Sequence, residues 1–127
     1  MDPSRDSGRR RCYLESIDLA KRIVELASDK LAENIVLLDI RALTTIADYF
    51  VICGGSSGRQ VQAISREIQD TLRDEGVRPL HGEGETDSNW ILLDYGSVIV
   101  HVFTTEERDF YKLERLWHEA IPVVKMQ

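Results

Sequence analysis

Apolar residues between positions 17 and 31 recur at the spacing of one face of an α-helix, with charged residues between them. The set is Ile17, Ala20, Val24, Ala27 and Leu31. Two continuous apolar runs follow, Ile35–Leu38 and Tyr49–Cys53, and their lengths are typical of buried strands. The polar connection at 41–48 has room for one helical turn. The pattern therefore predicts one amphipathic helix and then two strands.

A second helix is predicted after the glycine-serine turn at 54–58. Ser57 and Gln60 have the spacing of a capping box, in which each side chain caps backbone N–H groups at the helix start. The apolar face of this helix consists of Val61, Ile64, Ile68 and Leu72. Gly76 is placed to end the helix, and Pro79 prevents its resumption.

The next elements are two strands, Trp90–Leu93 and Val98–Phe103, joined across Asp94–Ser97 as a hairpin. Gly96 can supply the positive φ that such a turn needs. The acidic loop at 80–89 comes before the hairpin, and its beginning could add a short edge strand. Thr104 and Glu107 form a second capping-box pattern. It opens a last helix with an apolar side of Phe110, Leu113, Leu116 and Trp117, and Pro122 lies beyond its end.

The order α-β-β-α-β-β-α predicts an α/β (α+β) fold, a small mixed β-sheet flanked by helices. The second strand, second helix and third strand should form a parallel, right-handed crossover unit, followed by an antiparallel hairpin. We expect a flexible N-terminal tail at 1–14, one domain at 15–120 and a C-terminal tail at 121–127.

Composition narrows the partners of the chain. With 127 residues and a formal net charge of −6, it is one folded domain and a poor general nucleic-acid binder. A basic protein partner fits this charge better, because opposite charges favour the encounter. No apolar run is long enough to span a membrane. Cys12 and Cys53 are too few for a disulfide framework, so reduced thiols and a cytoplasmic location are expected.

The turn at 54–58 is the feature most typical of an enzyme, because free N–H groups at a helix start can bind phosphate. It lacks the lysine and hydroxyl residue that end a P-loop, and it does not match G-x-G-x-x-G. A tight strand-to-helix turn capped by Ser57 explains it more simply. A nucleotide-binding module or residual nucleotidyltransferase using this turn stays open as the alternative function.

Nucleotidyl transfer needs paired carboxylates that hold Mg²⁺ on the phosphates. Asp94 has Leu92 two residues before it in place of a second carboxylate, and nothing in the sequence brings Asp39 close to Asp94. Cys53 and His101 lack a third residue to orient them as a nucleophile–base pair. The three histidines share no ligand spacing, and the acidic loop does not match an EF-hand. No catalytic, cofactor or metal site is therefore predicted.

Trp90 and Tyr95 stand at the ends of the third predicted strand. Aromatic residues in such places either pack in a core or anchor an interface. The aliphatic residues between and after them already supply a core, which favours the interface role. Arg59 follows the glycine-serine turn and is most simply a solvated residue at the helix start.

The chain from Ile17 to Trp117 resembles the ribosomal silencing factor family, also called the Iojap-related family. The resemblance rests on ADYFVICGGSSGRQV at 47–61, WILLDYG at 90–96 and VIVHVF at 98–103. It continues in the predicted last helix through Tyr111, Leu113, Glu114, Leu116 and Trp117. It implies a nucleotidyltransferase-like fold without the catalytic carboxylates.

The resemblance also implies a function. Members bind the large ribosomal subunit through its fourteenth protein, which sterically blocks joining of the small subunit and represses translation during nutrient limitation. The implied partner-binding residues are Trp90, Asp94, Tyr95 and Gly96, with Asp48 and Arg59 as weaker candidates. Ser97 replaces the acidic residue usual after the turn glycine. A homodimer in which Trp90 packs against its own symmetry mate is a third alternative.

Overall fold

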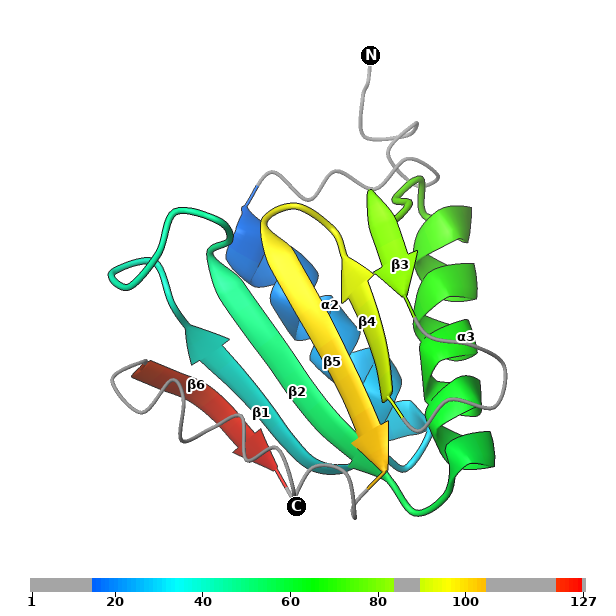
Figure 1. Ribbon diagram of the computed structural model, residues 1–127. Coiled ribbons are helices and arrows are strands. Elements are labelled where there is room, and N and C mark those ends of the chain that lie inside the picture. The colour runs from blue at the N-terminus through cyan, green and yellow to red at the C-terminus, as the bar shows by residue number, and fades with distance from the viewer. Residues whose placement is uncertain (1–14, 84–89, 105–120, 127) are drawn as a thin grey trace.

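The computed structural model describes residues 15–83, 90–104 and 121–126, which form two helices and one sheet (Figure 1). In chain order the elements are α2 Ser16–Asp29, β1 Glu33–Asp39, β2 Tyr49–Gly55, α3 Gly58–Asp74, β3 His81–Glu83, β4 Trp90–Asp94, β5 Val98–Thr104 and β6 Ile121–Met126. The expected N-terminal tail, most of the acidic loop and the expected last helix from 105 onward lie outside the described residues.

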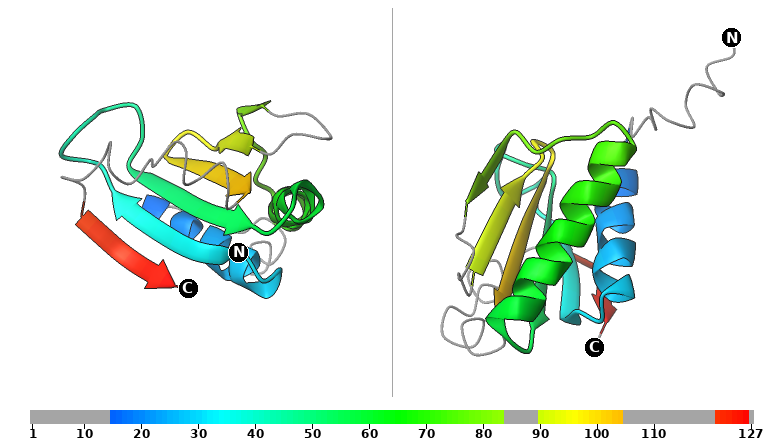
Figure 2. Two further views of the ribbon diagram at one scale, coloured as in Figure 1. Left: turned by 60° about the horizontal axis from the view of Figure 1, so that its bottom comes forward. Right: turned by 90° about the vertical axis from the view of Figure 1, so that its right-hand side faces the viewer.

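The strands form one six-stranded sheet in the order β3-β4-β5-β2-β1-β6. Among these strands only β2 and β5 pair in parallel, and the other neighbours are antiparallel. Both helices lie on the same face of the sheet, as the right-hand view of Figure 2 shows. The predicted mixed sheet with helices is confirmed, and the acidic loop does begin with a short edge strand, β3.

The parallel crossover joins β2 to β5, whereas the sequence predicted that β2 would pair with the strand at Trp90. Their register runs from Tyr49 opposite Val98 to Gly55 opposite Thr104. The prediction was wrong because burial decides which strand is central. β5 is buried on both faces except at Ile99, while β4 alternates between half-buried and buried residues. A parallel strand is normally covered on both faces, so β4 takes the place beside the edge.

The expected C-terminal tail at 121–127 is also corrected, because residues 121–126 form β6. β6 pairs antiparallel with β1, from Ile35 opposite Met126 to Asp39 opposite Ile121. The middle of β1 is buried on both faces, so leaving its outer backbone groups unpaired would be costly. Pro122 suggested only a helix stop, but proline is compatible with an edge strand.

The sheet separates two apolar clusters. Between the sheet and the helices lies the larger one, which takes alternate residues of the strands, such as Val51 and Val100, and the apolar faces of α2 and α3. The opposite face, which α2 and α3 leave uncovered, carries a smaller cluster. Its buried members are Val36, Leu38, Ile40, Ala47, Phe50, Ile52 and Phe103, with Trp90 and Ile99 packed against them.

The helix ends agree with the sequence in one case and differ in the other. Gly76 adopts a φ of 89° just after α3, as a terminating glycine should. α2 instead ends at Asp29, and Leu31 lies beyond it with a φ of 62° and 76% of its surface exposed. The apolar spacing that placed Leu31 on the buried face therefore continued past the real end of the helix.

Candidate functional site

The turn of the β4–β5 hairpin is fixed by its own polar groups. Asp94 accepts a hydrogen bond at Oδ1 from the backbone N–H of Gly96, at 2.8 Å, and Gly96 adopts a φ of 87°. The carbonyl of Asp94 accepts from the N–H of Leu80 at 2.7 Å, which ties the turn to the segment before β3. The Oδ2 atom of Asp94 makes no hydrogen bond within the described residues. One carboxylate oxygen thus builds the turn while the other remains available.

Asp48 lies at the same end of the sheet. The carbonyl of Ser97 accepts from the backbone N–H groups of Asp48 at 2.8 Å and of Tyr49 at 3.1 Å. The carboxylate of Asp48 accepts at Oδ2 from the hydroxyl of Ser16, at 2.7 Å. The structure therefore brings Asp48 and the hairpin turn together. The Asp48 side chain also has a structural task, because it joins the start of α2 to the start of β2.

Tyr95 is not the exposed anchor that the sequence predicted. It is 8% exposed and belongs to the cluster between sheet and helices. Its hydroxyl is buried and has no hydrogen-bond partner among the described residues, and burial raises its pKa to about 12. The position at a strand end misled the prediction, because Tyr95 continues the alternation of Ile91 and Leu93 and so faces the helices with them. The contribution of Tyr95 is to hold the hairpin on the core.

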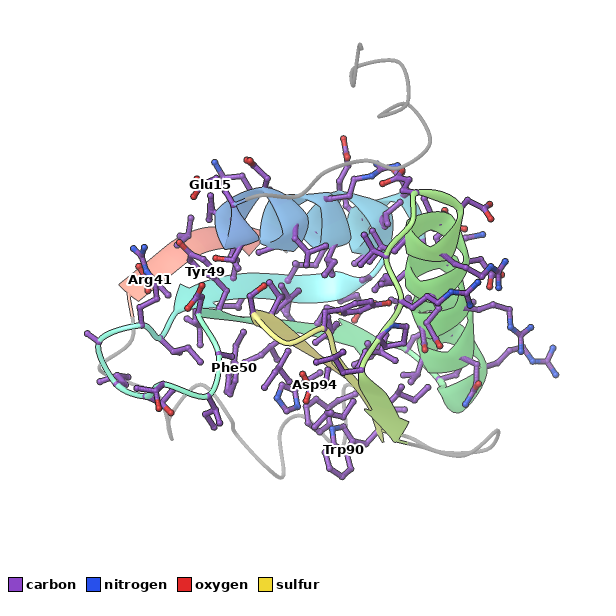
Figure 3. The ribbon with its side chains drawn as sticks, turned by 90° about the horizontal axis from the view of Figure 1, so that it is seen from above. Glu15, Arg41, Tyr49, Phe50, Trp90 and Asp94 are labelled. Carbon is purple, nitrogen blue, oxygen red and sulfur yellow. The ribbon has the colours of Figure 1, made fainter. Side chains whose placement is uncertain are left out.

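Trp90 lies at the opposite end of β4 and on the face away from the helices (Figure 3). It is half-buried, and its ring is parallel to that of Phe103, with 5.8 Å between centroids and 6° between planes. Phe103 is opposite Trp90 in the β4–β5 register. The stacking partner thus holds the indole in one orientation while part of it stays accessible.

Between Trp90 and the turn, the same face continues through Leu92 and Asp94, because alternate residues of a strand share a face. Ile99 is opposite Asp94 on β5 and is also half-buried. We call Trp90, Leu92, Asp94 and Ile99 the β4 surface. Leu92 and Ile99 were not among the predicted site residues. The two-residue alternation from Trp90 was the signal that could have found Leu92.

Arg59 is exposed on the first turn of α3. This turn follows the end of β2, where Gly54 is opposite Phe103, so Arg59 lies at the Trp90 end of the sheet. α3 covers the other face, however. The structure therefore does not make Arg59 part of the β4 surface.

His101 lies beside the β4 surface, on the same face of the sheet. It is 8% exposed, with Leu92 opposite it on β4 and Ile52 opposite it on β2. Its ring contacts Phe50 edge-on at 5.1 Å and lies parallel to Phe103 at 6.0 Å. Neither ring nitrogen has a partner among the described residues, and burial lowers its pKa to about 4. His101 lies on the face opposite Val100 and Val102, and this face is aromatic around it.

The glycine-serine turn is filled by side chains of the protein itself. Gln60 accepts at Oε1 from the N–H of Ser56 at 3.0 Å and from its hydroxyl at 2.8 Å. Its Nε2 donates to the carbonyls of Lys30 and Leu31, both at 3.1 Å. Ser57 caps α3 by accepting from the N–H of Gln60 at 3.2 Å. Gln60 thus takes up donors that a phosphate would need and joins the turn to the end of α2.

Gly55 has a packing reason at the same turn. A Cβ added there would lie 3.1 Å from the backbone nitrogen of Val61 and 3.2 Å from its Cγ2. The glycine therefore allows β2 to run directly against the start of α3. This contact explains the residue without a ligand.

Catalytic pairs do not assemble in the described part of the chain. Asp39 and Asp94 are on β1 and β4 with two strands between them, a lateral separation of about 14 Å at the usual strand spacing. Asp39 is paired with Arg41 at 2.8 Å, and this guanidinium holds the pKa of the carboxyl below its usual range. Cys53 and His101 are on adjacent strands, but Cys53 lies in the cluster between sheet and helices, whereas His101 packs against Phe50 on the opposite face. No group of three metal-binding side chains occurs among residues 15–83, 90–104 and 121–126.

Fold and site together define a small mixed-sheet protein in which α2 and α3, the helices of the described residues, leave one face of the sheet uncovered, with a stacked tryptophan on that face. Residues 13–127 match the family model described as "Ribosomal silencing factor during starvation", RsfS. The chain is 45% identical over 104 residues to ribosomal silencing factor RsfS of Bacillus subtilis, covering 79% of this chain and 88% of that protein. It is 32% identical over 109 residues to chloroplastic protein Iojap of Zea mays, covering 86% of this chain and 47% of that protein. The chain belongs to the family of ribosomal silencing factors.

Solved structures of similar proteins have the same fold. A crystal structure of a protein from Chromobacterium violaceum superimposes with a TM-score of 0.79 at 34% identity, covering 82% of this chain and 87% of that chain. A second one, from Bacillus halodurans, has a TM-score of 0.75 at 37% identity, covering 84% of this chain and 97% of that chain. Neither described helix is long and apolar enough to cross a membrane.

Proposed function

We propose that this chain binds the large ribosomal subunit through the β4 surface and keeps the small subunit from joining. The observation that carries the proposal is the position of Trp90, which is held by Phe103 on the face that α2 and α3 leave uncovered. A rigid, partly accessible tryptophan loses little conformational freedom on binding, and such residues often dominate interface energies. Leu92 and Ile99 extend the apolar contact.

The partner on the subunit is its fourteenth protein, as the resemblance to the family implies. Charge supports a basic partner, because the chain carries a net charge of −6 and the β4 surface includes the carboxylate of Asp94. Attraction between opposite charges speeds association, while the buried apolar contact slows dissociation. The turn at Gly96 then approaches the partner together with Asp94.

The mechanism is steric and needs no chemical step. A bound factor occupies space that the small subunit requires, so occupancy alone determines the effect. A dissociation constant near 1 nM corresponds to about −12 kcal/mol, which an interface of about 1,200–2,000 Å² can supply. Such a factor acts without a cofactor, in the cytoplasm, and lowers translation when nutrients are limiting.

A subunit-joining assay tests this function. Purified small and large subunits are mixed with and without the chain, and light scattering follows their association. We expect the scattering increase to be lost as the chain saturates the large subunit, and we expect the chain to sediment with large but not with small subunits. Undiminished joining at saturating chain, or sedimentation with small subunits alone, would overturn the proposal.

A further inference from the structure

An open groove with a volume of about 530 Å³ runs along the outer side of α3. Its walls are polar and include three arginines and a single acidic residue. They consist of Gln62, Ser65, Arg66, Gln69, Asp70, Arg73, Arg78 and Pro79. The groove thus carries a net positive charge on a chain whose total charge is −6. Figure 3 shows nitrogen-tipped side chains that project outward from α3.

The arginines differ in how they are engaged. Arg73 contacts Asp70 at 3.3 Å and Asp74 at 3.9 Å. Arg66 and Arg78 are exposed, and neither makes an ion pair or side-chain hydrogen bond within the described residues. Both guanidinium groups are therefore available to an anionic ligand. Guanidinium groups match phosphate oxygens in geometry and are more weakly hydrated than ammonium groups.

The spacing along α3 suits an extended ligand. Arg66 and Arg73 are about 10 Å apart along the helix axis, given a rise of 1.5 Å per residue. Gln69 donates from Nε2 to the hydroxyl of Ser65 at 3.0 Å, which orders the floor between the arginines. The groove can therefore offer guanidinium groups to more than one phosphate.

The groove also has a suitable position relative to the β4 surface. α3 covers the helix side of the sheet, and the segment with Arg78 and Pro79 leads from α3 into the edge strand β3, next to β4. The right-hand view of Figure 2 shows α3 alongside this edge of the sheet. A partner that covers the β4 surface and extends around the β3 edge would reach the groove. A ribosomal surface is made of both protein and RNA.

We propose that the α3 groove binds the phosphodiester backbone of ribosomal RNA next to the protein that the β4 surface contacts. This inference rests on the proposed binding to the large subunit. Phosphate contacts carry no sequence information, so their role is to add affinity and to fix the orientation of the chain. Two or three contacts do not make an acidic chain a binder of free RNA. They act only once the protein contact has placed the groove beside the strand.

The test compares two double variants that remove the same charge. R66Q/R78Q removes two arginines of the groove, and K21Q/K30Q removes two exposed lysines at α2. The affinity for purified large subunits is measured by pelleting at several KCl concentrations. They cover roughly 50 to 200 mM, the range over which phosphate contacts lose much of their affinity. Each lost phosphate contact should lower the slope of log affinity against log salt by about 0.7–0.9.

We expect R66Q/R78Q to lower this slope by about 1.5 and to weaken binding about tenfold or more in low salt, while K21Q/K30Q keeps the slope of the original chain. Binding of R66Q/R78Q to the isolated fourteenth protein should equal that of the original chain. Equal salt slopes for R66Q/R78Q and K21Q/K30Q would overturn the inference. An equal loss of affinity of R66Q/R78Q for the isolated fourteenth protein would also overturn it, because the groove would then contact protein and not RNA. If the original chain itself fails to bind large subunits, the proposed function falls, and this inference with it.

Discussion

The indole ring of Trp90 lies parallel to the phenyl ring of Phe103, with 5.8 Å between the ring centroids. The two residues are direct neighbours across β4 and β5, and Phe103 is only 2% exposed. A fully buried ring therefore supports a partly exposed one. This pair places a large apolar side chain in a fixed orientation on the face away from the helices, which is what an interface anchor requires.

Tyr95 should act on stability and not on binding. In Tyr95→Phe a buried hydroxyl without a partner among the described residues is removed, so the free energy of unfolding should stay the same or rise by about 1 kcal/mol. Tyr95→Ala leaves a cavity between sheet and helices and should cost about 3–5 kcal/mol. Urea denaturation measures both. If Tyr95→Phe is as stable as the original chain but binds large subunits more weakly, the Tyr95 hydroxyl contacts the partner and this prediction is wrong.

His101 should make the fold sensitive to moderate acid. Its pKa in the folded chain is lowered from 6.5 to about 4, so the folded state binds fewer protons than the unfolded state below pH 6.5. The folded state has its full stability above pH 6.5. It loses stability as the pH falls toward 4, because over this range the unfolded chain binds a proton that the folded chain does not. Between pH 7 and pH 5 the loss should be about 2 kcal/mol.

Chemical denaturation across this pH range checks the histidine effect, with His101→Leu as the comparison. The strand neighbours of His101, Leu92 and Ile52, are uncharged, so leucine keeps the apolar contacts and removes the titration. The variant should show a loss smaller by about 2 kcal/mol. Equal pH dependence of the two chains would show that the ring does not titrate as described.

Gly55 and Gly54 offer a matched test of the glycine-serine turn. Gly55→Ala places a Cβ 3.1 Å from the nitrogen of Val61, while Gly54→Ala meets only ordinary contacts at 3.5 and 3.6 Å. The first should cost about 1–3 kcal/mol of folding free energy and the second less.

Calorimetry with ATP and Mg²⁺ on the original chain should give no binding heat. A clear isotherm that Gly55→Ala abolishes would favour the nucleotide-binding alternative.

Asp94→Asn separates the two tasks of this side chain. In the original chain the N–H of Gly96 donates to Oδ1 of Asp94 at 2.8 Å. The asparagine amide keeps an oxygen that can accept this hydrogen bond but removes the charge. The thermal unfolding midpoint should change little, and association with large subunits should become slower and less sensitive to salt. Stopped-flow association at two salt concentrations measures this. An unchanged association rate would show that the charge of Asp94 does not speed association with the large subunit.

The periodicity of the sequence predicted most of the elements because apolar spacing records burial. It could not predict that β5 rather than β4 is the parallel neighbour of β2, since both strands are apolar and the choice depends on which one is covered on both faces. β6 was missed for a related reason. Pro122 and Lys125 are unusual in a strand, and only the unpaired edge of β1 explains why the chain pairs there.

The site was predicted less completely than the fold. Trp90 and Asp94 lie on one face because alternation along a strand is fixed by the backbone, and the sequence contained this information. Tyr95 lies on the opposite face with Ile91 and Leu93, as the same alternation continued by one residue would have predicted, but the prediction treated it only as a residue at the end of the strand. Asp48 required tertiary knowledge, because its partner Ser16 is 32 residues away.

The most direct test of the account is the affinity of Trp90→Ala for purified large ribosomal subunits, compared with Leu31→Ala. Leu31 is also a large apolar residue, 76% exposed, and it lies outside the β4 surface. Loss of an interface anchor costs about 2 kcal/mol or more, so Trp90→Ala should bind about 30-fold more weakly while retaining its circular dichroism spectrum. Leu31→Ala should bind as the original chain does. A folded Trp90→Ala chain with undiminished affinity would show that the face with the stacked indole is not where the ribosome is bound.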